Sequence, residues 1–231
     1  MSNTRLIVAL DVDSVEDAEK IVDEIGPQVE WYKIGKQIFT REGKKCLEML
    51  KSKNKKVFLD LKFHDIPNTV AQAVKSAISI GADMVNFHAV GGSEMIKKTV
   101  EVNKALNPDC LLIAVTVLTS MDHAGLQELG IEGTPAEVVS RFAGIAKESG
   151  ADGVVCSALE IDLVKDKCGT DFQLIVPGIR PAGSATDDQK RIMTPGEAAE
   201  KGAQFIVVGR PITKAGDKAA AAAAVLEELD S

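Results

Sequence analysis

The sequence is poor in the residues from which metal centres, disulfide frameworks and nucleic-acid surfaces are built. Its three histidines lie too far apart along the chain to predict a metal cluster. They are His64, His88 and His123. Its four cysteines contain no CxxC pair, so their spacing fits neither a zinc site nor a small disulfide framework, and we expect free thiols in a reducing compartment. They are Cys46, Cys110, Cys156 and Cys168.

An excess of positive charge and a long apolar run are also missing. The formal net charge is -7 and the pI is about 5.1, which argues against a protein that binds the nucleic-acid backbone through a basic face. A small phosphorylated ligand held by one or two local cations is compatible with this balance. No apolar run approaches the ~20 residues of a membrane helix, and no charged and then apolar leader precedes the first predicted strand. We therefore expect a cytoplasmic protein that binds neither nucleic acid nor membranes.

What the sequence does contain is a regular alternation of short apolar runs and helical segments. Most runs are continuous and rich in β-branched residues, as expected of strands buried on both faces. They cover residues 6–10, 29–32, 57–59, 84–87, 111–118, 153–156, 173–176 and 205–208. Strand and helix alternating eight times predicts an α/β protein, a (β/α)8 TIM barrel, with residues 1–231 as a single domain. The alternative, a doubly wound open sheet, usually has a glycine-rich turn after its first strand, and residues 11–14 are not one.

Capping residues and prolines mark where several predicted helices begin. Ser14 precedes two acids, as at a helix N-terminus. Thr134 and Thr194 are each followed by a proline and, three residues on, by a glutamate, which is the spacing of a capping box. Pro67 can open a helix, and the alanine-rich segment 219–224 predicts a terminal one.

The most informative segment runs from Asp60 to Pro67, directly after the apolar run 57–59. If the strand continues, the side chains of Asp60 and Lys62 point the same way, and Asp65 lies within a loop's reach of both. Carboxylates nearby favour the protonated form of a lysine, which makes it a poor Schiff-base nucleophile but a good proton donor to a carbanion. A lone Asp-x-Lys is usually a structural ion pair, but the carboxyl end of a barrel strand is where catalysis occurs, so we favour catalysis.

Other polar residues also follow predicted strands, and in a barrel all strand ends meet at one face. Asp11 and Lys33 follow the first two strands and suit sugar hydroxyls, although either could instead be a structural charge. Thr119 and Ser120 follow the fifth and can offer hydroxyl groups or backbone amides to a planar ring.

Two segments of the C-terminal part predict binding of an anion. Gly209 and Arg210 follow the last strand, where barrels often bind phosphate through backbone N–H groups and a charged donor. The loop 177–193 is polar, glycine-rich and long, so we favour a lid over a solvated loop without a role. Arg180 and Gln189 within this loop can reach a phosphate.

Five segments form a specific combination that covers nearly the whole chain. They read DLKFHDIPNT (60–69), LTSM (118–121), VPGIRP (176–181), DDQKRIMTP (187–195) and VVGRPIT (207–213), and the similarity starts at IVALDV (7–12). Together they closely resemble the orotidine 5'-monophosphate decarboxylases of the bacterial type. The resemblance implies a (β/α)8 barrel that converts orotidine 5'-monophosphate to UMP, the last step of de novo pyrimidine synthesis, with no metal and no organic cofactor.

The same resemblance implies a role for each candidate residue. Lys62 would be the proton donor to carbon 6 of the ring, and Asp60 would flank it. Asp65, with Ile66 and Thr69, would reach into the site of the neighbouring subunit, which makes the enzyme a homodimer with shared sites. The other positions would bind the nucleotide: Asp11 and Lys33 the ribose, Thr119 and Ser120 the pyrimidine, Gly209 and Arg210 the phosphate, with Pro177, Arg180 and Gln189 in the closing loop.

Two rival hypotheses stay open. Sugar-phosphate lyases such as 3-keto-gulonate-phosphate decarboxylase and hexulose-phosphate synthase resemble the chain in an Asp-x-Lys-x-x-Asp motif. They bind Mg²⁺ and have an acidic metal ligand at the end of the second strand, where this chain has Lys33. The other hypothesis is a non-catalytic nucleotide-binding barrel, which the intact charge array counts against.

Overall fold

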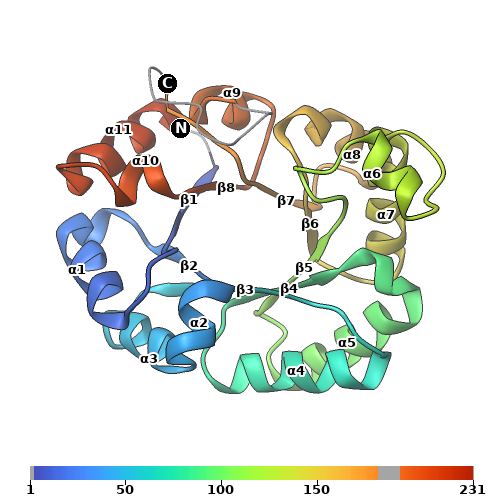
Figure 1. Cartoon of the computed structure of the whole chain (residues 1–231), viewed down its shortest axis with the longest axis horizontal. Helices are drawn as coiled ribbons and strands as arrows, with labels where there is room; N and C mark the ends of the chain where they lie inside the picture. Colours follow the sequence, from blue (N-terminus) through green and yellow to red (C-terminus); the bar gives the residue numbers. More distant parts are fainter. Residues whose placement is uncertain (1–2, 182–192, 231) are drawn as a thin grey trace.

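The predicted strands form one closed parallel barrel in chain order, with β8 pairing β1 (Figure 1). The computed structural model describes residues 3–181 and 193–230. The strands are β1 (Arg5–Ala9), β2 (Trp31–Gly35), β3 (Lys56–Phe63), β4 (Met84–His88), β5 (Leu111–Val115), β6 (Gly153–Val155), β7 (Gln173–Val176) and β8 (Phe205–Val208). The (β/α)8 barrel is therefore confirmed, and the open sheet is excluded because no strand of the ring lacks a neighbour on either side.

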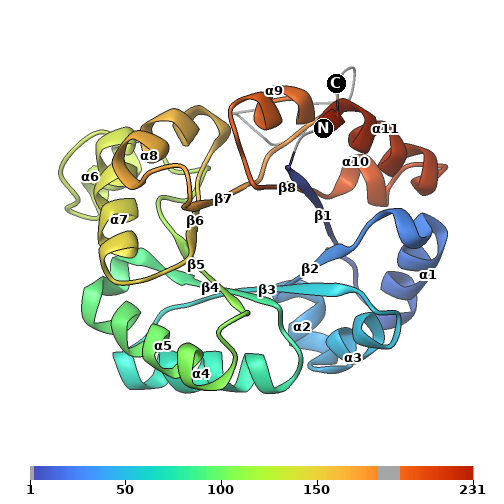
Figure 2. The same cartoon turned by 180° about the vertical axis from the view of Figure 1, so that it is seen from behind.

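Helices surround the ring on its outside, as Figures 1 and 2 show from its two ends. The α-helices are α1 (Val15–Ile25), α2 (Lys36–Glu42), α3 (Lys45–Ser52), α4 (Pro67–Ser79), α5 (Gly92–Leu106), α6 (His123–Glu128), α7 (Pro135–Glu148), α8 (Ile161–Cys168), α9 (Pro195–Glu200), α10 (Arg210–Thr213) and α11 (Lys218–Asp230). Short 3₁₀ turns are η1 (Gly26–Gln28), η2 (Ala89–Gly91) and η3 (Ala158–Glu160). The predicted caps hold: Ser14 caps α1, and Thr134 and Thr194 complete capping boxes on α7 and α9.

The core has two layers because strand side chains alternate between the two faces of the barrel wall. Outward-facing residues such as Val8, Ile34 and Leu59 pack under the helices. Inward-facing residues fill the barrel itself, where the rings of Trp31 and Phe205 meet edge to face at 5.3 Å. The inner layer consists of Ile7, Ala9, Trp31, Phe58, Met84, Ile113, Ile175, Phe205 and Val207. It closes the barrel below the site.

Three strands differ from the sequence prediction by more than one residue at an end, and three others by one residue. β2 continues through Lys33 to Gly35, so Lys33 belongs to the strand and its side chain is buried. β3 runs on to Phe63, but its pairing with β4 is irregular after Leu59. β5 ends at Val115, three residues earlier than the apolar run suggests, and beyond it the Thr116 hydroxyl donates a hydrogen bond to a carbonyl in β6.

The predicted thiols are free and buried at Cys46, Cys110, Cys156 and Cys168. Burial raises the pKa of the Cys46 thiol to about 11, which keeps it protonated at neutral pH. Of the helices in the described ranges, none combines the length and apolar character needed to span a membrane.

Candidate active site

The polar side chains at the mouth of the barrel stand one step above the inner core. Residues i and i+2 of a strand point to the same face. Lys33, Asp60 and Asn86 each follow an inner-core residue of β2, β3 or β4 by two positions, so all three enter the barrel from neighbouring strands. The alternation that packs the core therefore also gathers the site.

Lys33 and Asp60 form a row of alternating charge with two further side chains, Asp11 and Lys62. The Lys33 ammonium lies 3.0 Å from Oδ1 of Asp11 and 3.3 Å from Oδ2 of Asp60. The other oxygen of Asp60 accepts a hydrogen bond of 2.5 Å from the Lys62 ammonium. The row thus reads Asp11, Lys33, Asp60, Lys62, and each inner member touches two opposite charges.

Burial makes the centre of this row electrostatically strong, since water screens buried charges poorly. The side chains of Lys33 and Asp60 are each 11% exposed. Burial alone would lower the pKa of Lys33, but Asp60 and Asp11 outweigh it and raise that pKa above its ordinary value. Burial would likewise raise the pKa of Asp60, but Lys33 and Lys62, with the hydrogen bonds from Lys62 and Asn86, hold it below its usual range. Both groups are therefore charged at neutral pH.

Lys62 reaches Asp60 from an irregular strand. The β3–β4 pairs at residues 59 and 63 face residues 85 and 87, so three residues of β3 stand opposite Asn86 alone. Lys62 has a φ of 55°, a left-handed conformation that non-glycine residues seldom adopt. Such a bulge bends a strand and redirects a side chain. Asp60 and Lys62 lie side by side, as predicted, but through this irregularity and not through the regular strand from which the prediction was made.

Asn86 fills the gap in the ladder. Its Nδ2 donates a hydrogen bond of 2.7 Å to Oδ1 of Asp60, and its Oδ1 accepts one of 2.7 Å from the backbone N–H of Lys62. Asn86 is 1% exposed. Sequence analysis missed this residue, although a polar amide in the middle of the apolar run of β4 was a usable signal.

Gly35 was also missed, and it leaves space for the row. A Cβ at this position would lie 2.9 Å from Oδ1 of Asp11 and 3.0 Å from Nζ of Lys33. Its backbone is extended, so the requirement for glycine is one of space and not of backbone conformation.

Two adjoining cavities open at this end of the barrel. The first, of about 180 Å³, has Asp60, Lys62 and Asn86 on one side and apolar residues on the other. The apolar side consists of Val115, Val117, Leu118, Val155, Ile175 and Val207, with Thr119 and Pro177 at its edge. A planar ring that enters this cavity would lie against an apolar wall with its other side toward the charge row.

The second cavity, of about 250 Å³, is rich in cations. Lys33, Arg180, Arg210 and Lys214 line it, with Asp11 as the acid. Gly209 and Gly178 contribute backbone to its wall. Because Lys33 and Pro177 line both cavities, the second is continuous with the first and suits the anionic end of the same ligand.

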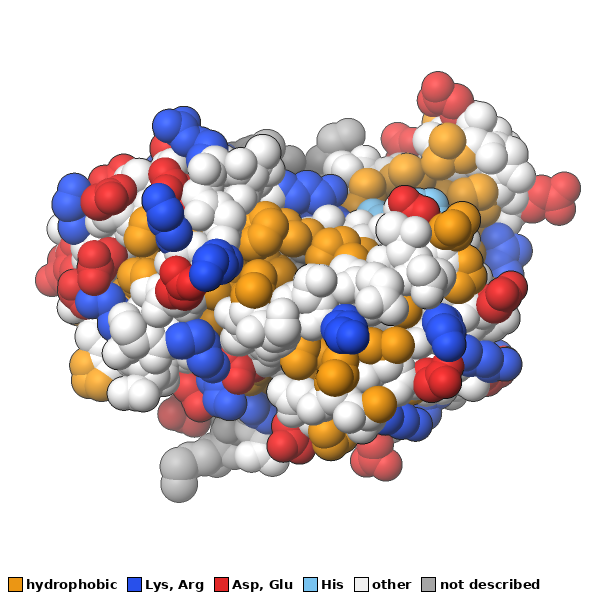
Figure 3. Space-filling model, turned by 90° about the horizontal axis from the view of Figure 1, so that it is seen from below, with side chains coloured by type: hydrophobic (Ala, Val, Ile, Leu, Met, Phe, Trp, Pro, Cys, Tyr) orange, Lys and Arg blue, Asp and Glu red, His pale blue; other side chains and the backbone are white. Residues whose placement is uncertain are grey.

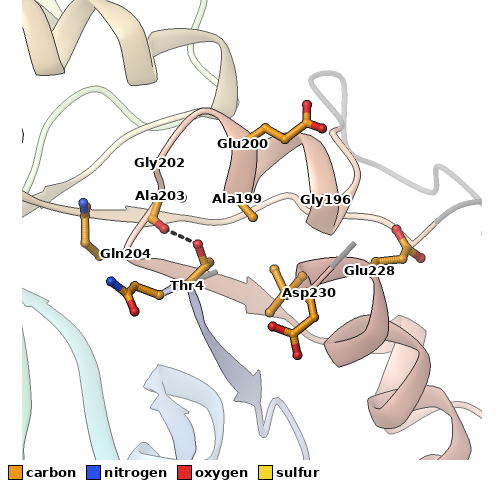
Figure 4. Close-up of a pocket in the computed structure, with 11 residues that line it drawn as sticks. Thr4, Gly196, Ala199, Glu200, Gly202, Ala203, Gln204, Glu228 and Asp230 are labelled. Carbon is orange, nitrogen blue, oxygen red and sulfur yellow. Dashed lines mark hydrogen bonds between the residues drawn. The ribbon is translucent and has the colours of Figure 1, made fainter. Parts of the chain in front are cut away.

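The opposite end of the barrel has a hollow of different character (Figure 4). Thr4 donates a hydrogen bond to the carbonyl of Ala203 there. Glu200, Glu228 and Asp230 line the hollow, and no Lys or Arg of the described residues does. Its charge would repel an anion, so the mouth at the carboxyl ends of the strands is the candidate site.

Several predicted residues lie outside these cavities. Asp65 is exposed, and its carboxylate accepts a hydrogen bond from the backbone N–H of Ile66. In the described part of the chain Lys62 pairs with Asp60 and not with Asp65, so the role of Asp65 beside a lysine stays a prediction. Thr69 is exposed on α4, and Ser120 is exposed and lines neither cavity.

The predicted lid falls largely outside the described residues. Gln189 is among those not described, as are residues 182–192 in general. Arg180, at the start of this loop, is buried and lines the second cavity, and one of its guanidinium nitrogens donates a hydrogen bond to the carbonyl of Ile179. The predicted position of Arg180 near a bound anion therefore agrees with the geometry, and the role of the loop stays a prediction.

Two histidines lie at the edge of the site. The rings of His64 and His88 are 5.8 Å apart, His64 exposed and His88 half-buried at the end of β4. Burial, followed by the charges of His64, Lys36 and Lys62, holds the pKa of His88 below its ordinary value, although Asp60 opposes this. Residues 3–181 and 193–230 contain no cluster of three or more His, Cys, Asp or Glu side chains that could bind a metal ion.

Comparison with known proteins agrees with this geometry. Residues 4–225 match the sequence profile described as "Orotidine 5'-phosphate decarboxylase / HUMPS family". The chain is 47% identical to the orotidine 5'-phosphate decarboxylase of Moorella thermoacetica, over 98% of this chain and 92% of that one. It is 48% identical to that of Pasteurella multocida, over 94% and 93%. It superimposes on the crystal structure of the Lactobacillus acidophilus orotidine 5'-phosphate decarboxylase with a TM-score of 0.88 and 40% identity, covering 99% of this chain and 100% of the other.

Proposed function

The chain belongs to the orotidine 5'-phosphate decarboxylase / HUMPS family, and on the geometry of its site we propose that it decarboxylates orotidine 5'-monophosphate to UMP. This reaction is the final step of de novo pyrimidine synthesis. The observation that carries the proposal is the row Asp11, Lys33, Asp60, Lys62, whose centre is buried and which lines an apolar cavity and a cation-rich one.

The chemistry requires a charge array of this kind. When the bond between carbon 6 and the carboxylate breaks, CO₂ leaves and the electron pair stays on carbon 6. The pyrimidine ring has no electron sink for this pair, so protein charge must stabilise it, and slow reactions can require over ~20 kcal/mol of transition-state stabilisation. The Lys62 ammonium faces the first cavity, where it can attract the carbanion and then transfer a proton to carbon 6.

Asp60 supports this step in two ways. It holds the Lys62 ammonium in place through a hydrogen bond of 2.5 Å. Its own negative charge, kept by Lys33 and Lys62, lies where it would repel a substrate carboxylate bound beside it. A fixed array needs no reorganisation during the reaction, which is the main advantage of preorganised charges.

The second cavity supports binding of the 5'-phosphate. Arg210 and Arg180 provide charged donors, and Gly209 keeps the chain free of a side chain at the cavity wall. Lys33 lines both cavities and Asp11 lines the second, where ribose hydroxyls would lie. Binding energy from the distant phosphate can then help to assemble the reacting centre.

The decisive experiment is to incubate the purified protein with orotidine 5'-monophosphate and to follow the loss of its ultraviolet band. We expect turnover at an unchanged rate in the presence of a chelator, because this chain has Lys33, paired with Asp11 and Asp60, at the end of the second strand, where the related lyases have an acidic metal ligand. A rate that the chelator abolishes would favour the sugar-phosphate lyase. Binding of UMP without any turnover would favour a non-catalytic nucleotide-binding barrel.

We further propose a homodimer in which Asp65, Ile66 and Thr69 act on the partner's site. All three are exposed, and the side of the barrel formed by α4 and α5 presents hydrophobic side chains between charged ones (Figure 3). Ile66 is 68% exposed, and it borders a hollow with Pro67, Asn68 and Lys97. Sedimentation of Ile66→Asp beside the unchanged protein tests this, and an unaltered mass would contradict the interface.

Mixing inactive variants tests whether sites are shared. Lys62→Ala and Asp65→Ala chains should each be inactive, but a hybrid dimer regains one site with both groups. A hybrid dimer should therefore have about half the activity of an unchanged dimer, and a 1:1 mixture after random subunit exchange, in which about half of the dimers are hybrids, about a quarter. No recovery, although exchange is demonstrated with labelled chains, would place Asp65 outside the reaction.

A further inference from the structure

Asn86 is a buried polar residue for which the proposed reaction has no direct use. It lies in β4, one strand away from Lys62, and it is 1% exposed. Its side-chain amide does not simply fill a hole, because both of its ends are hydrogen-bonded to the charge row at 2.7 Å. An amide placed in this way connects two residues whose mutual geometry matters for the reaction.

The orientation of the amide follows from its partners. The backbone N–H of Lys62 can only donate, and the carboxylate of Asp60 can only accept. The carbonyl oxygen of Asn86 must therefore face Lys62, and its NH₂ group must face Asp60. The reverse orientation would leave two buried groups unsatisfied, which is costly in a low-dielectric site.

The break in the β3–β4 ladder explains why a side chain is needed here. Three residues of β3 stand opposite one residue of β4, so the N–H of Lys62 has no ladder partner. Lys62 is also in the left-handed conformation, which persists only when surrounding contacts hold it. Asn86 supplies such a contact and at the same time anchors the carboxylate that binds the Lys62 ammonium.

We propose that Asn86 is a positioning residue that locks Lys62 in its left-handed conformation and fixes the Asp60 carboxylate beneath the Lys62 ammonium. This inference rests on the proposed function for its catalytic consequence, but not for its structural one. Asn86 touches the backbone of Lys62 and not the predicted phosphate cavity. Its loss should therefore slow the chemical step and leave nucleotide binding nearly unchanged.

The test compares Asn86→Leu with Asn103→Leu. Both remove a buried asparagine amide in favour of an apolar side chain of similar size, but Asn103 lies on α5 and donates to the carbonyl of Cys110, outside the site. For Asn86→Leu we expect kcat to fall about a hundredfold, as for a catalytic group misplaced by ~1 Å, with KM and the affinity for UMP within threefold of the unchanged protein. Asn103→Leu should keep kcat whatever it costs in stability.

Hydrogen exchange at the Lys62 amide provides a readout that does not depend on activity. In the unchanged protein this amide should be protected, and in Asn86→Leu it should exchange at least tenfold faster, while Asn103→Leu leaves it protected. Asn86→Ala gives the same comparison if the leucine variant does not fold. Fast exchange of the Lys62 amide in the unchanged protein would overturn the proposal. So would Asn86 variants that both keep the protection of this amide, or that both keep kcat. If the unchanged protein has no decarboxylase activity but Asn86→Leu still loses protection at the Lys62 amide, the proposed function is refuted and the structural role of Asn86 is kept.

Discussion

The two halves of the barrel contribute differently to the site. Strands β1 to β4 bring charge and amide groups, the buried Lys33, Asp60 and Asn86 and the partly buried Lys62, with Asp11 just past β1. Strands β5 to β8 bring an apolar wall, and their cations Arg180, Arg210 and Lys214 lie beyond the strand ends. Rigid strands therefore hold the groups proposed for chemistry, and the segments after the strands hold those proposed for binding.

This division has a physical consequence. Charges interact more strongly when one side of them faces apolar atoms and not water. The wall formed by Val155, Ile175 and Val207 faces the charge row across the cavity. This wall carries no charge, but it keeps water away from the row and thereby strengthens the electric field of the row. Substitutions in the first half should therefore change kcat, and substitutions beyond β7 and β8 should change KM.

The largest effect should come from Lys62→Ala. Proton transfer by a placed group contributes ~10²–10⁴-fold and electrostatic stabilisation ~10²–10³-fold, so we expect kcat to fall by at least about 10⁴-fold. The fold should survive, which circular dichroism and affinity for UMP can verify. Lys20→Ala, which removes an exposed ammonium on α1, is the control. A near-normal kcat in Lys62→Ala would contradict the proposed mechanism.

A smaller effect of the opposite kind should come from Arg210→Ala. A hydrogen bond to a charged group contributes about 1.5–3 kcal/mol, which corresponds to a loss of roughly 10- to 150-fold in kcat/KM, carried mainly by KM. Orotidine, which lacks the phosphate, should react with both proteins at rates within threefold of each other. Equal losses on the two substrates would contradict the phosphate assignment.

Gly35→Ala tests the space on which the row depends. The new Cβ would press on Oδ1 of Asp11 and Nζ of Lys33, both ends of movable side chains, so the fold should lose little stability while kcat falls about tenfold by misplacement. Gly216→Ala, where nothing lies within 4 Å of the added carbon, is the matched control. Thermal unfolding and steady-state kinetics measure the two effects, and an unchanged kcat would show that the row tolerates displacement.

The smallest effect concerns stability in mild acid. Because the pKa of His88 is lower in the folded protein than the ordinary ~6.5, the unfolded chain takes up its proton first. His88 thus contributes stability above pH ~6.5 that is lost as the pH falls through its folded pKa. His88→Asn should flatten the fall of the unfolding free energy between pH 7 and 5 in urea titrations, compared with the unchanged protein. Equal slopes in the variant and the unchanged protein would contradict a neutral His88.

Much of the fold was readable from local patterns. Buried parallel strands are continuously apolar, and caps such as Thr134 act within one helical turn, so neither requires knowledge of distant residues. The candidate site was partly readable for the same reason: strand ends of a barrel converge, which predicted that Asp11, Lys33, Asp60 and Arg210 lie at one mouth.

The partners of individual side chains could not be predicted from the sequence. Asp65 follows Lys62 closely in sequence, but the chain turns into α4 and leaves it exposed with a backbone partner. Lys33 suited sugar hydroxyls or a structural charge, but its pairing with both Asp11, just past β1, and Asp60, in β3, was not predicted. Asn86 had no motif around it. Each outcome depends on the relative height of neighbouring strands, which no local pattern encodes.

By itself, the sequence determined that strands and helices alternate, where four of the helices begin, and which end of the strands carries the polar groups, because propensity, capping and burial act over a few residues. Only the tertiary structure decided the pairing within the charge row, the bulge that directs Lys62 to Asp60 and the bridge from Asn86. Those features depend on the register between β2, β3 and β4, and register is a property of the closed barrel as a whole.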